Sequence, residues 1–361
     1  MLPKVANLNK TNKSIIMFLF RFLKTGMVAV LSLLYSAAAM AESCEQDILS
    51  HPEFWKSVTL EQVTTCIEEG INLDRRYGFE FTPLIPAIAF SANPEVTRAL
   101  IDAGADINRK NIRGRTPLHV AAITRYSENL RLLIAAGPDF EAVDGNGNSA
   151  IHFGANHATN RQNIELLLEA GFVVNQPNEH GRTPIFQAAY NTSNPDVMRT
   201  LIEAGADVNY TLPRGLTALH LATDVIGGLE NMNLLLDAGA DPNKYAASIS
   251  PLFFATIPST DNEDFAKVNV LVDAGADLHR PIGLGNYILH ALIENGIWSR
   301  DQICRDVSPI IANMIERGAD PNQQNRAGES AFDTLDIAMS YNKCANESEI
   351  YQKILGVLSG E

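Results

Sequence analysis

A short phrase recurs along this chain with a nearly constant period, and this repetition constrains the fold more than any other feature. The phrase reads DAGADIN at 102–108, EAGADVN at 203–209, DAGADPN at 237–243, DAGADLH at 273–279 and ERGADPN at 316–322. Counted from Gly70, the glycines at this place follow at spacings of 34, 33, 34, 34, 34, 36 and 43 residues. A regular period of roughly 20–50 residues is the signature of a stacked-repeat architecture.

A second phrase keeps the same period and predicts where helices begin. It reads TPLHVAA at 116–122, SAIHFGA at 149–155, TPIFQAA at 183–189, TALHLAT at 217–223 and SPLFFAT at 250–256. Thr or Ser supplies an N-cap oxygen, and a following Pro has the φ of a first helical residue. The recurring Gly ends a second, apolar helix, because Gly adopts the left-handed conformation at little cost. Each unit is therefore predicted as turn, short helix, loop and longer helix.

The two phrases together resemble the ankyrin repeat, over roughly residues 44–361. The resemblance implies an all-α solenoid of helix-turn-helix repeats of about 33–34 residues with a capping unit at each end. The expected N-terminal cap is 42–78 and the expected C-terminal cap is 326–361. The repeats between them are 79–111, 112–144, 145–178, 179–212, 213–246, 247–282 and 283–325.

The first 41 residues differ from the rest in charge and composition. They contain five basic and no acidic residues, and an apolar run from Met27 to Tyr35 is followed by small residues. Ala39-Met40-Ala41 fits a signal-peptidase site, so we expect residues 1–41 to be a signal peptide and Glu42 the mature N-terminus. An uncleaved membrane anchor is the alternative, but the run is shorter than the ~20 residues of a spanning helix. Translation from Met17 is also open.

The charge of the chain limits the classes of partner, and its cysteines predict disulfides. The net charge of the chain is −14, and the part after residue 41 carries 42 acidic against 23 basic residues. Such a body repels nucleic acid and anionic membrane, so we expect neither as a partner. The four cysteines, Cys44, Cys66, Cys304 and Cys344, predict disulfides Cys44–Cys66 and Cys304–Cys344 in an exported protein. Four free buried thiols are the alternative.

No group of residues predicts catalysis, a cofactor or a metal. His119, His152, His220 and His290 share the fourth position of the second phrase, and the resemblance implies that each imidazole bridges the loops of adjacent repeats. His157 and His180 stand where a binding face is expected, and His51 and His279 have no partner signature. There is no G-x-S-x-G sequence and no phosphate-binding glycine loop. We therefore expect a protein without enzymatic activity.

The resemblance also implies which residues contact a partner, namely those flanking the turn glycine and those ending the first helix. The turn positions are Arg113, Arg115, Asn146, Asn148, His180, Arg182, Arg214 and Leu216; the helix-end positions are Ile123, Asn156, His157, Tyr190 and Asp224. Four arginines thus recur along one edge of an acidic body. We predict that they receive an acidic partner, with Tyr190 as an apolar anchor. The alternative is that these arginines are solvated or bonded to neighbouring loops.

The expected function is a protein-binding scaffold of the cell envelope, periplasmic or else secreted. Exported bacterial ankyrin proteins resemble this layout, and some such relatives act as stabilisers or as inhibitor or immunity partners of enzymes. We expect a monomer with one protein partner, without stable membrane insertion after signal cleavage. An enzyme with an unrecognised surface site and an effector translocated into another cell are the alternatives.

Overall fold

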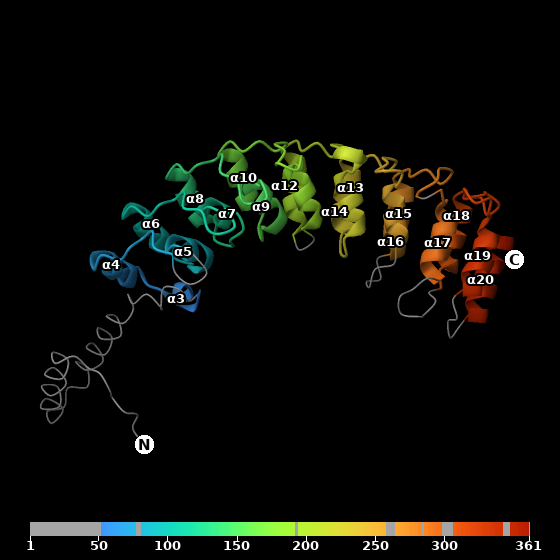
Figure 1. The fold of residues 1–361 in the computed structure, drawn as a ribbon, viewed down its shortest axis with the longest axis horizontal. Coiled ribbons are helices and arrows are strands. Elements are labelled where there is room, and N and C mark those ends of the chain that lie inside the picture. The colour runs from blue at the N-terminus through green and yellow to red at the C-terminus, as the bar shows by residue number, and fades with distance from the viewer. Residues whose placement is uncertain are drawn as a thin grey trace, which may run out of the picture. The chain divides into compact units, whose positions relative to one another are not determined.

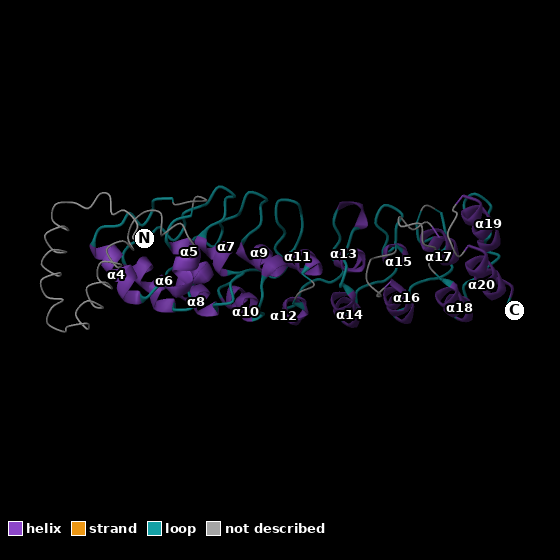
Figure 2. Ribbon diagram, turned by 90° about the horizontal axis from the view of Figure 1, so that it is seen from below, coloured by secondary structure: helices purple, strands orange, loops and turns teal. Residues whose placement is uncertain are grey.

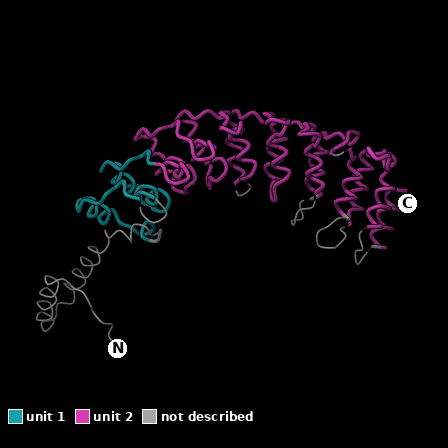
Figure 3. Tube along the Cα trace, viewed as in Figure 1, with its two compact units in different colours: residues 1–109 teal, residues 110–361 magenta. Residues whose placement is uncertain are grey.

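The chain forms two compact units, one up to Arg109 and one from Lys110 onward (Figure 3). The computed structural model describes residues 52–76, 81–191, 194–257, 264–283, 285–297, 306–341 and 347–360. Segment 1–41, expected to be a signal peptide, therefore lies outside the described residues, as do Cys44, Cys304 and Cys344. Within the described ranges all regular structure is helical, apart from two isolated bridges, Ala246 with Ile249 and Gly283 with Asn286.

The first unit contains four described helices. They are α3 (Pro52–Ser57), α4 (Leu60–Glu68), α5 (Leu84–Phe90) and α6 (Pro94–Asp102), and α3 packs on α5 while α4 packs on α6. Thr59 begins α4 with a capping box, in which Gln62 N–H donates to Thr59 Oγ1 and Thr59 N–H donates to Gln62 Oε1. Trp55 is buried in α3, as suits an end unit with a single neighbouring repeat.

The second unit repeats a pair of helices seven times within the part that the structure describes. The first helices are α7 (Pro117–Ala121), α9 (Ala150–His157), α11 (Pro184–Tyr190), α13 (Ala218–Asp224), α15 (Pro251–Thr256), α17 (Ile288–Ile297) and α19 (Ala331–Tyr341). The second helices are α8 (Ser127–Ala135), α10 (Gln162–Glu169), α12 (Pro195–Glu203), α14 (Leu229–Asp237), α16 (Asp264–Asp273), α18 (Ser308–Glu316) and α20 (Glu347–Ser359). Figures 1 and 2 show these helices in two rows, with long loops projecting beside the row of first helices.

Helix limits in the second unit follow the local signals of the sequence. Thr116 precedes α7 in an extended conformation, and Pro117 is the first helical residue. At the other end of a pair, Gly205 has a φ of 86°. Its N–H donates to Ile202 O and the next N–H, of Ala206, donates to Leu201 O, so the last carbonyls of α12 are satisfied. α17, with 10 residues, is longer than α18, with 9, so the predicted order of helix lengths is reversed in that pair.

The core of the second unit lies between the two rows of helices. Each first helix packs on the first helices of its neighbours, and small residues such as Ala121, Ala122 and Ala189 are fully buried there. The second helices contribute larger side chains, among them Leu133, Leu167 and Leu201, all with no exposed surface. Full burial of one such side chain contributes about 1.5–3 kcal/mol, so the stacked pairs supply the main stabilising term.

Asparagines join the loops of successive repeats. Asn175 Oδ1 accepts the N–H of Asp207 at 2.9 Å, and its Nδ2 donates to Gly205 O at 3.0 Å. Asn209 makes the same two bonds to Asp241 and Gly239, and Asn243 makes them to Asp277 and Gly275. We call each of these paired contacts an asparagine rung. The final Asn of the repeated phrase is thus a connector between repeats.

Candidate protein-binding face

In the described part of the second unit, four of the projecting turns are closed by an Asn or Asp side chain, that of Asn111, Asp144, Asn178 or Asn325. Asn111 Oδ1 accepts the N–H groups of Arg113 at 2.9 Å and Arg115 at 3.0 Å. Asp144 does the same for Asn146 and Asn148, and Asn178 for His180 and Arg182. These bonds hold the backbone on both sides of the turn glycine, so the flanking side chains start from a fixed position.

The turns are also bonded to one another. Gly145 N–H donates to Arg113 O at 2.8 Å, and Ala247 N–H donates to Arg214 O at 2.9 Å. The turn at Arg214 lacks an Asn or Asp closure, and Arg214 itself has a φ of 74°. That conformation is costly for a residue with a Cβ atom, and the bond to Ala247 offsets part of the cost.

The histidines of the second phrase bridge adjacent repeats, as the resemblance implied. His119 Nδ1 lies 2.9 Å from Thr116 Oγ1, and its Nε2 lies 2.9 Å from Asn148 O in the next loop. The Nε2 atoms of the others reach carbonyl oxygens of the next projecting loop in the same way: His152 to Gln176 and Arg182, His220 to Ile249, and His290 to Glu329. Burial lowers the pKa of all four, and that of His220 to about 4. Both ring nitrogens of His119, His152 and His220 have partners, whereas His290 Nδ1 has none within the described residues. Neutral imidazoles bonded in this way are structural links.

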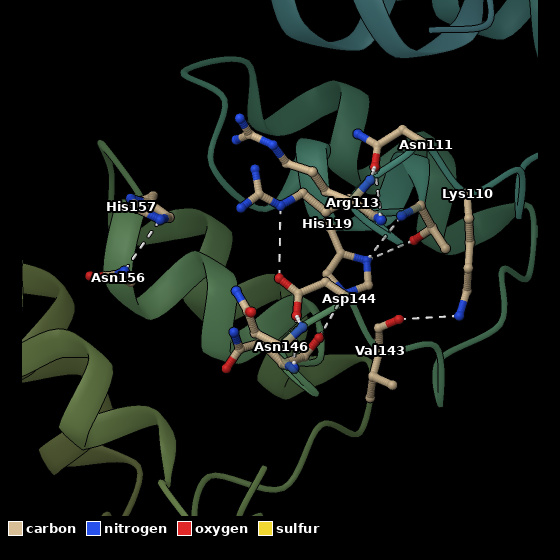
Figure 4. Close-up of polar contacts among 12 residues, drawn as sticks. Lys110, Asn111, Arg113, His119, Val143, Asp144, Asn146, Asn156 and His157 are labelled. Atoms are coloured by element: carbon tan, nitrogen blue, oxygen red, sulfur yellow. Dashed lines mark hydrogen bonds and ion pairs between the residues drawn. The ribbon is translucent and has the colours of Figure 1, made fainter. Parts of the chain in front are cut away.

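The four turn arginines divide into two kinds. Arg115 is partly buried: its Nε lies 3.7 Å from the buried carboxylate of Asp144, and its guanidinium stacks 4.1 Å from the centre of the Phe153 ring. Arg113 and Arg214 are exposed, and Arg182 is half-buried. The side chains of these three make no hydrogen bond or ion pair with any part of the chain that the structure describes. Three guanidinium groups are therefore available to a partner, and the fourth is held in place. Figure 4 shows Arg113 among its neighbours Asn111, Asp144 and Asn146.

The ends of the first helices continue this face. His157 packs edge-on against Phe153 with ring centres 4.8 Å apart, and Asn156 Nδ2 donates to His157 Nε2 at 3.2 Å. Burial and the nearby Arg115 lower the pKa of His157, so it is neutral at pH 7. Tyr190 is 41% exposed at the end of α11. The Phe153 ring thus contacts both the Arg115 guanidinium and the His157 ring in one stacked cluster. The sequence did not indicate that these three side chains meet.

The side chains at the other predicted positions differ in exposure and in their hydrogen bonds within the protein. Asn146 and His180 are exposed at their turns, and Asp224 is exposed at the end of α13, whereas Ile123 and Leu216 are half-buried. Asn148 Oδ1 already accepts Asn178 Nδ2 at 2.7 Å and Gln187 Nε2 at 3.3 Å. The side-chain oxygen of Asn148 therefore joins its own repeat to the next one.

Two residues of this face were not among the predicted contacts, namely Asp144 and Phe153. Asp144 occupies the place of Asn111 and Asn178 in its turn, which the repeat alignment reveals. Its charge is the signal that could have identified the partner of Arg115. Phe153 follows His152 in the first helix, and no local pattern marks it as a platform for a residue from the preceding turn.

Cys66 lies on α4, is 3% exposed and is disulfide-bonded. Its predicted partner Cys44 and the predicted pair Cys304–Cys344 lie outside the described residues, so both pairings stay predictions. Within the described ranges, no three His, Cys, Asp or Glu side chains are grouped to hold a metal ion. In the same ranges, no helix has the length and apolar character needed to cross a membrane.

Stacked helix pairs, projecting turns and bridging histidines define a helical repeat protein, and the comparisons agree. The family profile described as ankyrin repeats (3 copies) matches residues 56–144, 126–212 and 151–246, together more than half of the chain. The chain belongs to the ankyrin-repeat family. The predicted all-α ankyrin solenoid is therefore confirmed. Ankyrin repeats are protein–protein interaction modules, so the coarse expectation of protein binding holds as well.

Individual relatives match over short stretches. Protein phosphatase 1 regulatory subunit 27 of Mus musculus is 35% identical over 89 residues, which are 24% of this chain and 57% of that protein. Protein fem-1 homolog C of Homo sapiens is 38% identical over 50 residues, 14% of this chain and 8% of that protein. The chain thus spans less than two thirds of either relative. The ankyrin repeat domain of human ASB11 aligns with 77% of this chain and 98% of its own at a TM-score of 0.50 and 20% identity, which shows a shared fold.

Proposed function

We propose that this protein is a non-catalytic scaffold that binds an acidic protein partner along the turns and first helices of its second unit. The observation that carries the proposal is the unpaired state, within the described residues, of the Arg113, Arg182 and Arg214 side chains. Arg forms planar, two-pronged hydrogen bonds with carboxylates, and an exposed charge can pair with a partner at little desolvation cost. The partner would be held as a stabilised or inhibited protein.

The stacked cluster gives this face an anchor beside its charges. Arg115 is fixed by Asp144 and Phe153, so a partner carboxylate meeting it finds a pre-oriented guanidinium. Tyr190 offers an exposed aromatic ring of the kind that dominates binding energy at interfaces. Favourable charge mainly accelerates association, so we expect binding to weaken as salt concentration rises.

A matched pair of triple variants tests the proposal. Replacement of Arg113, Arg182 and Arg214 by Ala should weaken binding of the partner at least about tenfold, since each charged hydrogen bond contributes about 1.5 kcal/mol or more. The control replaces Arg131, Arg161 and Arg199, which form ion pairs on the second helices. It removes the same charge from the other row of helices and should leave binding near wild type.

The partner for this test is recovered from envelope extract with the wild-type protein, identified by mass spectrometry and purified. Titration calorimetry at low and at high salt then gives the affinity of each variant, and thermal unfolding confirms that both fold. Equal affinities of the two triple variants would refute the proposed face.

We also propose that the protein acts outside the cytoplasm, in the periplasm. The basic, apolar and small-residue order of segment 1–41 supports this proposal, as does a disulfide at Cys66. The exported protein should begin at Glu42. N-terminal sequencing of the protein from a periplasmic fraction checks this, and a chain starting at Met1 or Met17 would contradict it.

A further inference from the structure

Two positions in the described part of the second unit carry another residue in place of the rung asparagine, His279 and Glu141, and neither forms a rung. Glu141 stands at the position that Asn175, Asn209 and Asn243 occupy in later repeats, and Val173 stands at the position of Asp207. Within the part of the chain that the structure describes, the Glu141 side chain makes no hydrogen bond or ion pair. In the same part, Val173 N–H and Gly171 O are without a protein partner. A carboxylate has no hydrogen to give to Gly171 O, so Glu141 cannot replace the asparagine amide.

A cavity of about 370 Å³ lies at this unformed rung. Gly171, Val173 and Glu141 line it together with two aromatic residues, Phe140 and Phe172, whose ring centres are 5.9 Å apart at an angle of 72°. Phe172 replaces the small Ala of the repeated phrase, and Val173 is 58% exposed. The volume falls in the range of small-ligand pockets, roughly 300–1,000 Å³, which combine apolar walls with a few placed polar groups.

The filled rungs show which chemical group fits the two free backbone groups. In each of them a primary carboxamide accepts an N–H with its oxygen, at 2.8–2.9 Å, and donates from its nitrogen to a carbonyl, at 2.9–3.0 Å. Val173 N–H and Gly171 O are the corresponding donor and acceptor at the unformed rung. A carboxamide from outside the chain would therefore meet the contacts that three internal asparagines already make.

We propose that this cavity binds a primary carboxamide attached to an apolar group. The amide oxygen accepts Val173 N–H, and one amide hydrogen is donated to Gly171 O. The second amide hydrogen faces the Glu141 carboxylate, and the apolar group packs against Phe140 and Phe172. Both a small aromatic amide and the glutamine side chain of a partner protein carry this chemistry. The site is independent of the arginine face, and the failure of either proposal leaves the other standing.

Titration of the ¹⁵N-labelled protein with benzamide tests the site, with the backbone amide resonance of Val173 as the readout. Methyl benzoate is the matched control, because it has the same ring and carbonyl but no N–H donor. We expect benzamide to shift the Val173 resonance and methyl benzoate to bind at least about tenfold more weakly, the effect of losing one hydrogen bond. Equal binding of the two compounds, or the absence of any shift, would overturn the proposal.

Two variants at Glu141 test whether benzamide binds through its amide group or only through burial of its ring. Glu141→Asn supplies an internal amide that fills the rung, so benzamide should bind at least about tenfold more weakly and the melting temperature should rise. Glu141→Ala leaves the rung open and removes only the carboxylate that faces the second amide hydrogen, so it should bind benzamide more tightly than Glu141→Asn does. Unchanged benzamide binding by a folded Glu141→Asn variant would contradict the proposed contacts.

Two peptides distinguish the sources of the amide. An acetylated Phe-Gln-Phe with an N-methylamide end carries the side-chain amide, and its Phe-Glu-Phe counterpart lacks it. Selective binding of the glutamine peptide, in competition with benzamide, supports a partner's side chain as the ligand. Binding of benzamide alone supports a free small amide. Failure of both benzamide and the glutamine peptide to bind would refute the site.

Discussion

Buried polar side chains connect one repeat to the next at defined atoms. Asn163 Nδ2 donates to Thr124 O at 2.7 Å, and Asn231 Nδ2 donates to Asn191 O at 3.1 Å. Lys267 takes the corresponding place on α16, where its ammonium group donates to Thr223 O at 3.2 Å and Val225 O at 2.8 Å. These carbonyls lie at the C-terminal ends of first helices, where the helix dipole favours donors and positive charge. Such contacts set the register between neighbouring helix pairs.

The buried histidines make stability depend on pH. The pKa of His220 is about 4 in the folded protein and near 6.5 in an unfolded chain. Between these values the unfolded state binds more protons, so stability is fully present above about pH 6.5 and is lost as pH falls toward 4. The shift corresponds to roughly 3 kcal/mol. His119, His152 and His290 act in the same direction, because burial lowers their pKa too.

Urea unfolding at pH 7, 6, 5 and 4 measures this dependence. We expect the midpoint to fall steadily below pH 6.5, and a His220→Gln variant to lose part of the slope at the cost of lower stability at pH 7. A pH-independent midpoint for the wild-type protein in this range would show that the imidazoles are not held neutral.

At the scale of elements, the projecting turns differ in how tightly they are packed. Gly215 and Gly181 both have positive φ, 87° and 75°. A Cβ atom on Gly215 would lie 2.1 Å from Tyr245 O, whereas one on Gly181 would have only Leu212 Cδ2 nearby, at 3.7 Å. The turn at Gly215 is therefore pressed against the backbone of the next turn, and the turn at Gly181 has room.

Alanine at these two glycines should separate backbone strain from steric conflict. Gly181→Ala should cost about 1 kcal/mol, the penalty of a left-handed conformation for a residue with a side chain. Gly215→Ala should cost clearly more, because the neighbouring backbone must also move. Thermal unfolding of the two variants gives the comparison, and equal losses would show that the turn at Gly215 shifts freely.

At the scale of the whole molecule, each helix pair of the second unit contacts the neighbouring pairs of that unit. The last pair, α19 and α20, packs on α17 and α18. The exposed side chains described on α20 are polar, whereas α19 also exposes Ile337 and Tyr341. Stability in repeat arrays is close to a sum of unit and interface terms, so the position of a defect decides its consequence.

Two equally buried leucines test this dependence on position. Leu167 on α10 and Leu335 on α19 both have no exposed surface, and truncation to Ala costs about 2–5 kcal/mol at such sites. Leu335→Ala should increase amide hydrogen exchange in α19 and α20 only. Leu167→Ala should increase exchange in α8, α10 and α12 and lower the main unfolding temperature. Identical exchange patterns in the two variants would contradict local, neighbour-dependent stability.

The sequence by itself determined the helix pairs, their caps and the turns, because these depend on residues a few positions apart. The Thr-Pro start of α7 and the left-handed Gly205 after α12 are such local signals. The resemblance to the ankyrin repeat also predicted the bridging role of the histidines, because each of them bonds to the same place in the repeat unit. Tertiary structure decided which turn arginines are free, because the Arg115 side chain contacts Asp144 in the next turn and Phe153 in the next first helix. Tertiary structure also formed the cavity at Glu141. Two loops about one repeat apart stack there, and the rings of Phe140 and Phe172 pack together beside the unformed rung.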